Sequence, residues 1–216
     1  MKKNNKSSDL YRSLRNAVAI GLILFVIGSF TEARGSNLNP RQIILVQLAE
    51  KWLNGFKTFK AGFTQTSSDG TSAVGDIEII RPGRMLINYK SPDGLQIFAD
   101  GAWMIYIDRN LKEVNQVPIK LTPARVLLQD KIELIGRASL RVEESKTKFR
   151  LALLPRESSE DGDITLIFSK NPSKLISWII TDPQGIQTTV LLDNIAINIP
   201  IEQGRLTYSP PDWAFD

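Results

Sequence analysis

Most of this chain falls into short segments in which apolar and polar side chains alternate, with turn signals between them. Phe59, Ala61 and Phe63 alternate with Lys60 and Gly62, which is the period-two pattern of a half-buried strand. Asp69-Gly70 is typical of a two-residue hairpin loop, and Pro82-Gly83 of a type II turn. About eleven such strands follow one another at short spacing, which favours a sandwich or a barrel.

Two helical signals interrupt the strands. Asn39 as N-cap with Pro40 at the first helical position predicts a helix before the sheet, and Thr122-Pro123 predicts a shorter one of two to three turns midway. A further short helix is expected over residues 130–138, and a last short strand over 206–208. The expected apolar contacts of the two main helices are Leu45, Leu48, Trp52, Val126, Leu127 and Leu128.

Strands that are neighbours in sequence pair most simply as hairpins, so one strongly curved sheet is the simplest topology. The sequence therefore predicts a mainly β fold with an α lid. It would be a single curved antiparallel sheet of about eleven strands that forms an unclosed barrel, covered by an N-terminal helix and a short inserted helix.

The first 35 residues have the pattern of a secretory signal peptide. Basic residues up to Arg15 precede an apolar run over 17–30, and a small-residue exit follows at Ala33-Arg34-Gly35. The apolar run is shorter than the roughly 20 residues that a membrane-spanning helix needs. We expect 1–35 to be cleaved, after Gly35 or after Ala33, and 36–216 to form one domain; an uncleaved membrane anchor is the alternative.

Charge and composition exclude several classes of function. The first 36 residues hold six of the 27 basic and two of the 23 acidic residues, so the remainder is formally neutral. Nucleic-acid binding needs a basic surface, and this chain is not expected to bind nucleic acid. The sequence contains neither Cys nor His, so no thiol nucleophile, imidazole base or Cys/His zinc site can form. We expect no catalytic residue, cofactor or metal.

A set of short motifs in fixed order resembles the periplasmic outer-membrane lipoprotein carrier family, LolA. These motifs are Phe63-Thr64-Gln65, Arg81-Pro82, Tyr89 with Pro92, Asp100-Gly101 with Trp103, and Tyr106 with Asp108. The likeness is densest from Phe63 to Leu128. One departure is Met85-Leu86-Ile87, where members of the family often have an aromatic-Arg-Trp-like run.

The resemblance implies a periplasmic chaperone that shields the acyl chains of lipoproteins in an apolar cavity. It implies three partners: acylated lipoprotein cargo, an inner-membrane lipoprotein-releasing ABC transporter, and an outer-membrane receptor or the outer membrane itself. The family's receptor is acylated on a Cys, so this chain resembles the soluble carrier. A monomer is expected.

The candidate site residues combine this resemblance with strand alternation. Arg81 follows Ile77 and Ile79 on one strand face, so its guanidinium is directed to the apolar side, where a buried cation needs hydrogen-bond partners. The resemblance implies that Arg81 holds the lid closed when no cargo is bound; a solvated strand-end arginine is the alternative. The expected acyl-chain cavity is lined by Phe63, Ile77, Ile79, Met85, Ile87 and Trp103, for which ordinary core packing is the alternative.

Three rival interpretations stay open at this point. A lipocalin-like binder of a free small lipid would close its barrel and place a helix after the strands. An envelope-stress sensor of the same fold would carry an additional domain. A carboxylate enzyme would need a pair such as Asp100 and Asp108, but Asp100 lies in a turn signal.

Overall fold

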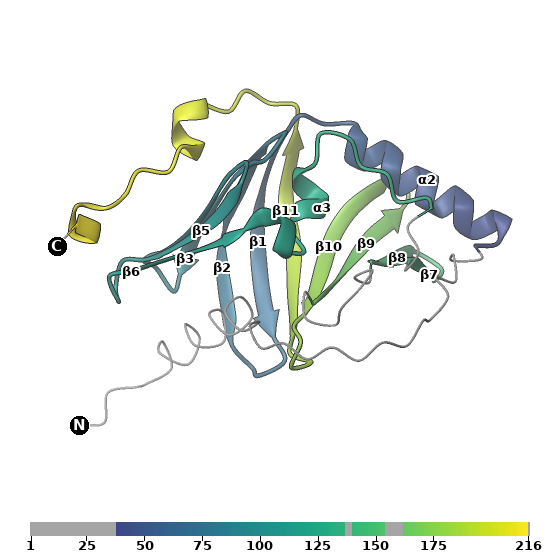
Figure 1. Cartoon of the computed structure of the whole chain (residues 1–216). Coiled ribbons are helices and arrows are strands. Elements are labelled where there is room, and N and C mark those ends of the chain that lie inside the picture. Colours follow the sequence, from purple (N-terminus) through teal and green to yellow (C-terminus); the bar gives the residue numbers. More distant parts are fainter. Residues whose placement is uncertain (1–37, 137–139, 154–161, 216) are drawn as a thin grey trace, which may run out of the picture.

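The computed structural model describes residues 38–136, 140–153 and 162–215 (Figure 1). The predicted signal peptide, 1–35, and both expected cleavage positions lie outside the described residues.

Eleven strands form one antiparallel sheet, as the sequence predicts. They follow the spatial order β6-β5-β4-β3-β2-β1-β11-β10-β9-β8-β7, so that hairpins extend to each side of the β1–β11 pair. β6 and β7 are the two edges, and the sheet is not closed (Figure 1). The strands are β1 (Thr58–Ser67), β2 (Ser72–Ile80), β3 (Arg84–Ser91), β4 (Leu95–Asp100), β5 (Trp103–Asp108), β6 (Glu113–Pro118), β7 (Leu140–Glu144), β8 (Lys148–Leu153), β9 (Asp163–Lys170), β10 (Ser173–Thr181) and β11 (Gln187–Ile197).

Helix α2 (Pro40–Asn54) begins where the sequence predicts. The Asn39 side chain accepts from the Gln42 amide, and the Gln42 side chain accepts from the Asn39 amide, which forms a capping box. The predicted apolar face is partly wrong, because Leu48 is 39% exposed. The buried residues of α2 are Leu45, Val46, Ala49 and Leu53, and Trp52 is half-buried. The helix is therefore rotated by about one residue from the expected phase.

The segment between β6 and β7 is less helical than predicted. It contains a 3-10 turn, η1 (Ile119–Leu121), and a single-turn helix, α3 (Arg125–Leu128). The Thr122 hydroxyl donates to the Ile119 carbonyl and does not cap α3. Residues 130–136 are not helical, because side chains of α2 bind backbone groups that a helix would pair internally. We call residues 119–135 the inserted segment.

The two faces of the sheet have separate apolar cores. On the covered face, α2 and the inserted segment pack on side chains from all eleven strands. Figure 1 shows α2 along the β7–β10 side of the sheet and α3 near its middle. On the opposite face, Leu86, Phe98, Ile105 and Ile107 pack against Leu206. Leu206 belongs to the 3-10 helix η3 (Gln203–Leu206). The predicted strand over 206–208 is therefore wrong; the chain after β11 crosses this face and ends in η4 (Asp212–Phe215).

Candidate functional site

Arg81 lies at the end of β2, between the sheet and the two helices that cover it. Its side chain is on the covered face and the residue is only 5% exposed. The Nε group donates to the Leu127 carbonyl of α3 at 2.8 Å, and Nη1 donates to the Leu53 carbonyl of α2. One guanidinium from the sheet therefore binds backbone carbonyls of both helices.

Arg81 stays charged at neutral pH although it is buried. Its carbon Cζ lies 4.0 Å from the ring centroid of Phe56, a geometry in which the aromatic face attracts the cation. Burial lowers the pKa of Arg81 to about 10, and the nearby Asp130 carboxylate partly offsets this effect. At neutral pH the guanidinium is therefore protonated and all its donors are present.

A second set of contacts fastens the inserted segment to α2. The Asn54 amide donates to the Ile132 carbonyl at 2.8 Å and accepts from the Ile132 amide at 2.9 Å. The Glu50 carboxylate accepts from the backbone amides of Leu134 and Ile135. The α2 helix and the inserted segment are thus linked by polar contacts from two α2 side chains as well as through Arg81.

We expect Asn54→Ala to release the inserted segment without disturbing the sheet. Each hydrogen bond contributes about 1 kcal/mol net, so losing two should speed hydrogen exchange of the Leu134 amide by about tenfold or more. Gln47→Ala, an exposed position on the same helix, is the matched control. Amide exchange followed by mass spectrometry measures both variants, and unchanged exchange over 130–135 in Asn54→Ala would contradict this account of the contact.

Five of the six residues proposed to line the cavity lie on the covered face. Phe63, Ile77, Ile79 and Met85 are buried there, and Ile87 is half-buried against the same cluster. The prediction that Trp103 lines the cavity is wrong, because Trp103 is 42% exposed. On β5, Met104 and Tyr106 face the covered side, so the alternation of the strand directs Trp103 to the opposite face.

The helix residues proposed as lid contacts are also mostly buried against this face. Val126, Leu127 and Leu128 belong to the covered core with Leu45, and Trp52 packs against it. Leu48 is the exception described above. On the covered face, side chains of the sheet pack on those of α2 and the inserted segment, so a large apolar guest between them has to displace these contacts.

Sequence reasoning missed the residues that surround Arg81. Leu53 contributes through its carbonyl, and Phe56 through its ring; neither role follows from residue type or spacing. Phe56 also has its ring centroid 5.4 Å from those of Trp52 and Phe59, which continues an aromatic cluster along the covered face.

The covered face also contains a buried polar pair. The Tyr89 hydroxyl donates to Gln65 Oε1 at 3.0 Å. Burial raises the pKa values of Tyr89 and of Tyr106, so both phenols stay neutral. An uncharged, hydrogen-bonded pair is compatible with an apolar surrounding, because the Tyr89 hydroxyl and Gln65 Oε1 are paired with each other.

The carboxylate pair considered for an enzyme is engaged in two turns. Asp100 Oδ1 accepts from the amides of Ala102 and Trp103, and Asp108 Oδ1 accepts from those of Asn110 and Leu111. Each carboxylate thus has a local structural role. Among the described residues no group of three or more His, Cys, Asp or Glu side chains has the arrangement of a metal site.

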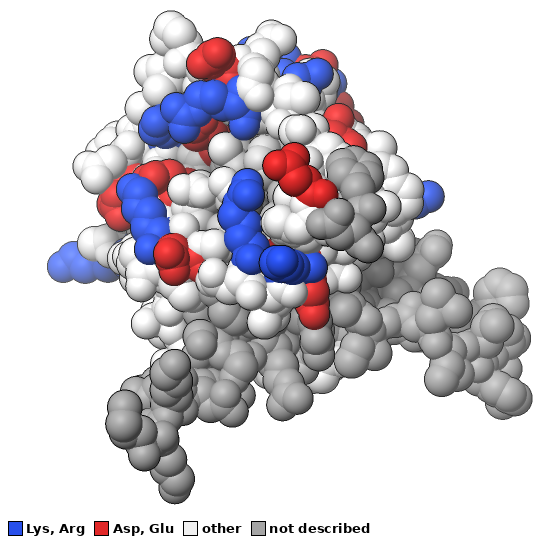
Figure 2. Space-filling model, turned by 90° about the vertical axis from the view of Figure 1, so that its left-hand side faces the viewer, with Lys and Arg blue, Asp and Glu red and all other residues white. Residues whose placement is uncertain are grey.

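The surface charges are mixed in sign. In Figure 2, acidic and basic side chains alternate over the visible face, without a continuous basic stripe. Ion pairs of the sheet include Lys90 with Asp76 and Lys60 with the buried Glu78. Within the part of the chain that the structure describes, no helix has both the length and the apolar character that crossing a bilayer requires.

Comparison with known proteins identifies the family of this chain. The outer-membrane lipoprotein carrier protein of Halorhodospira halophila is 27% identical over 186 residues, which cover 81% of this chain and 86% of that protein. The protein of the same name from Chromobacterium violaceum is 24% identical, over 80% of this chain and 86% of its own length.

A solved structure shows the same fold at low identity. An uncharacterized conserved protein from Thermus thermophilus matches with a TM-score of 0.51 and 10% identity, over 79% of this chain and 94% of that chain. The family model described as outer membrane lipoprotein carrier protein LolA matches residues 54–208, which include Arg81, the inserted segment and all eleven strands. The chain therefore belongs to the LolA family.

Proposed function

We propose that this protein is a chaperone that carries lipoproteins with their acyl chains shielded on the covered face of the sheet. The observation that carries the proposal is that Arg81 holds both covering helices over an apolar face through hydrogen bonds to their backbone carbonyls. Family membership and the names of the two curated relatives support the same function.

The physical need for such a cover follows from the cargo. Exposing an acyl chain to water costs about 0.8 kcal/mol per CH₂ group, so a multiply acylated protein needs a shield to cross an aqueous space. Apolar side chains line both sides of the interface between the sheet and its cover, one set from the strands and one from the helices. Acyl chains that enter between them replace contacts of the helices with the sheet, and polar contacts such as those of Arg81 can form again after release.

We also propose where the protein acts and between which membranes it carries its cargo. The predicted signal peptide implies export to the periplasm, where an inner-membrane ABC transporter supplies the cargo and an outer-membrane receptor, or the membrane itself, accepts it. The carrier acts as a soluble monomer. Mass spectrometry of the exported protein tests the first step, and a membrane-bound form that retains residues 1–30 would make it an anchored protein.

The fold favours this function over a lipocalin-like binder. Among the strands that the structure describes, β6 and β7 are two separate edges of the sheet, and the main helix precedes the strands. Lipocalin-like proteins close their barrel completely. A cover that is separate from the sheet and held by side-chain contacts suits a guest that has to be released.

We expect the protein without residues 1–35 to bind a fluorescent fatty-acid analogue saturably, and a triacylated lipopeptide to displace it. Movement of the cover creates the apolar space for both ligands. Fluorescence titration followed by competition measures this. A solid core would give no saturable binding, and displacement by the same peptide without acyl chains would contradict recognition of the lipid part.

A further inference from the structure

The sheet is split between β10 and β11 at one end. The two strands pair from Ser177 with Leu191 to Thr181 with Gln187, and no further. Beyond that point β10 continues along β9 to the pair of Ser173 with Lys170, while β11 continues along β1 to the pair of Ile197 with Phe59. Each strand therefore stays in its own half of the sheet, and a cleft opens between the halves.

Irregularities in both strands accompany this cleft. The β9–β10 register shifts between Leu175 and Ser177, which places Ile176 in a bulge. The β1–β11 register shifts opposite Lys60 and Gly62, and Asn194 there has a φ of 48°. A bulge disrupts the ladder locally and bends the strand that contains it, and both bulges lie at the end where β10 and β11 no longer pair.

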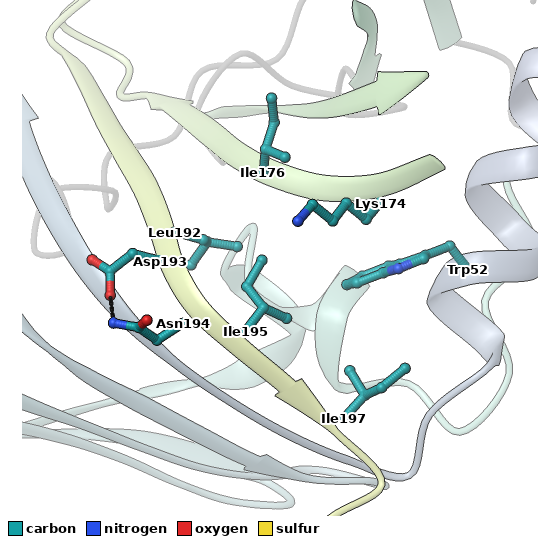
Figure 3. A pocket seen from close by; sticks show the side chains of 8 residues that line it. All are labelled: Trp52, Lys174, Ile176, Leu192, Asp193, Asn194, Ile195 and Ile197. Atoms are coloured by element: carbon teal, nitrogen blue, oxygen red, sulfur yellow. Dashed lines mark hydrogen bonds between the residues drawn. The ribbon is translucent and has the colours of Figure 1, made fainter. Parts of the chain in front are cut away.

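The cleft is a pocket of about 460 Å³ with mostly apolar walls, within the range of about 300–1,000 Å³ that small-molecule sites occupy. Figure 3 shows Ile176 on the β10 side, Leu192 and Ile195 on the β11 side, and the Trp52 ring of α2 closing one end. The other lining residues are Lys174, Asp193, Asn194 and Ile197.

Trp52 joins the cleft to the covered face. Its ring centroid lies 5.4 Å from that of Phe56 and 6.1 Å from that of Phe168, both of them buried in the covered core. An apolar guest in the cleft thus contacts Trp52, which packs on Phe56, the residue whose ring lies against Arg81. No residue of α3 lines this cleft. The Lys174 side chain points into the cleft, opposite the apolar residues of β11 (Figure 3).

We propose that this cleft binds one acyl chain of the cargo, with the Lys174 ammonium donating to the carbonyl at the head of that chain. This inference rests on the proposed function and adds a separate binding position for it. The volume and the mostly apolar walls fit a single hydrocarbon chain, and the cation fits the acceptor oxygen of its ester or amide. A peptide strand fits less well, because the bulges break the regular spacing of N–H and C=O groups that strand addition requires.

The absence of Cys from the chain gives a direct test, since one introduced Cys is the only thiol. Ile195→Cys and Ile176→Cys place it on either wall of the cleft. Val74→Cys, at an outward-facing position of β2 that is 39% exposed, is the matched control. Circular dichroism establishes that each variant folds. Modification by a maleimide is then followed by mass spectrometry, with and without a synthetic triacylated lipopeptide.

With the lipopeptide at about ten times its Kd, occupancy of the cleft should slow modification of both wall variants roughly tenfold and leave the Val74→Cys variant unchanged. Unchanged rates at both walls, while the lipopeptide still displaces a fatty-acid probe, would overturn this inference and leave the proposed function standing. Equal protection by the peptide without acyl chains would make the cleft a peptide site. Failure of the lipopeptide to bind at all would overturn both proposals.

Discussion

Replacing Arg81 with leucine should leave loading with lipoprotein intact and reduce its onward transfer by about tenfold or more. Leucine keeps apolar bulk and removes every donor that reaches the carbonyls of Leu53 and Leu127. Hydrogen bonds from a charged donor contribute about 1.5–3 kcal/mol each, and about 1.4 kcal/mol is a factor of ten. The empty, covered state loses this stabilisation and the loaded state does not, so release becomes less favourable.

The controls for this variant separate geometry from charge. Arg84→Leu removes an exposed arginine from the neighbouring strand β3 and should transfer cargo normally. Arg81→Lys should restore transfer only in part, because a lysine lacks the planar fork that reaches two acceptors.

Loading from inner-membrane vesicles and transfer to outer-membrane acceptors are measured separately. Burial lowers the pKa of Arg81 to about 10; the cation is lost only as the pH rises through that value, so the difference from wild type should be constant between about pH 6 and pH 8. Normal transfer by Arg81→Leu after normal loading would leave Arg81 without a part in the mechanism.

Gly75→Ala should destabilise the whole domain, because the sheet leaves no room for a side chain at this position. A Cβ atom on Gly75 would lie 2.4 Å from the backbone oxygen of Asn88 and 2.8 Å from the Phe63 ring. Phe63 is itself packed edge-on against Tyr89, with ring centroids 5.3 Å apart. Overpacking of a filled core costs about 1–3 kcal/mol, and here part of the obstruction is backbone that cannot rotate away.

Gly204→Ala is the matched control, since its Cβ would meet only a Glu202 oxygen at 3.9 Å. Its effect on stability should be small. Denaturant unfolding of both variants gives the two free energies of unfolding. Equal values would mean that β2 and β3 separate at Gly75 at no measurable cost, which would contradict the close packing of Phe63 on this strand.

Local signals in the sequence predicted much of the fold. Asn39-Pro40 begins α2 and Asp69-Gly70 lies in the β1–β2 turn, because each depends on backbone preferences of the residues themselves. The turn is longer than predicted, however, since it spans residues 68–71 and not two residues. The face of Arg81 followed from its spacing to Ile77 and Ile79 along one strand. Its two acceptors could not be predicted, since backbone carbonyls carry no signature in the sequence.

The errors come from patterns that permit more than one phase. Two apolar stripes with the same helical period run along α2, one through Ile44 and Leu48 and one through Leu45, Ala49 and Leu53. Only packing against the sheet selects the second, and it leaves Ile44 and Leu48 exposed. Trp103 was assigned to the cavity by residue type, although alternation along β5 places it with Ile105 on the opposite face. The cleft between β10 and β11 depends on bulges in both strands, which the alternating pattern did not reveal.

The most direct test of the central claim is to identify what the exported protein carries. The protein is purified from the periplasm under native conditions, and the molecules bound to it are analysed by mass spectrometry. The account predicts lipoproteins with intact acyl chains, bound to wild type and retained more strongly by Arg81→Leu. A free lipid as the sole bound molecule, or no bound lipoprotein in either form, would contradict it.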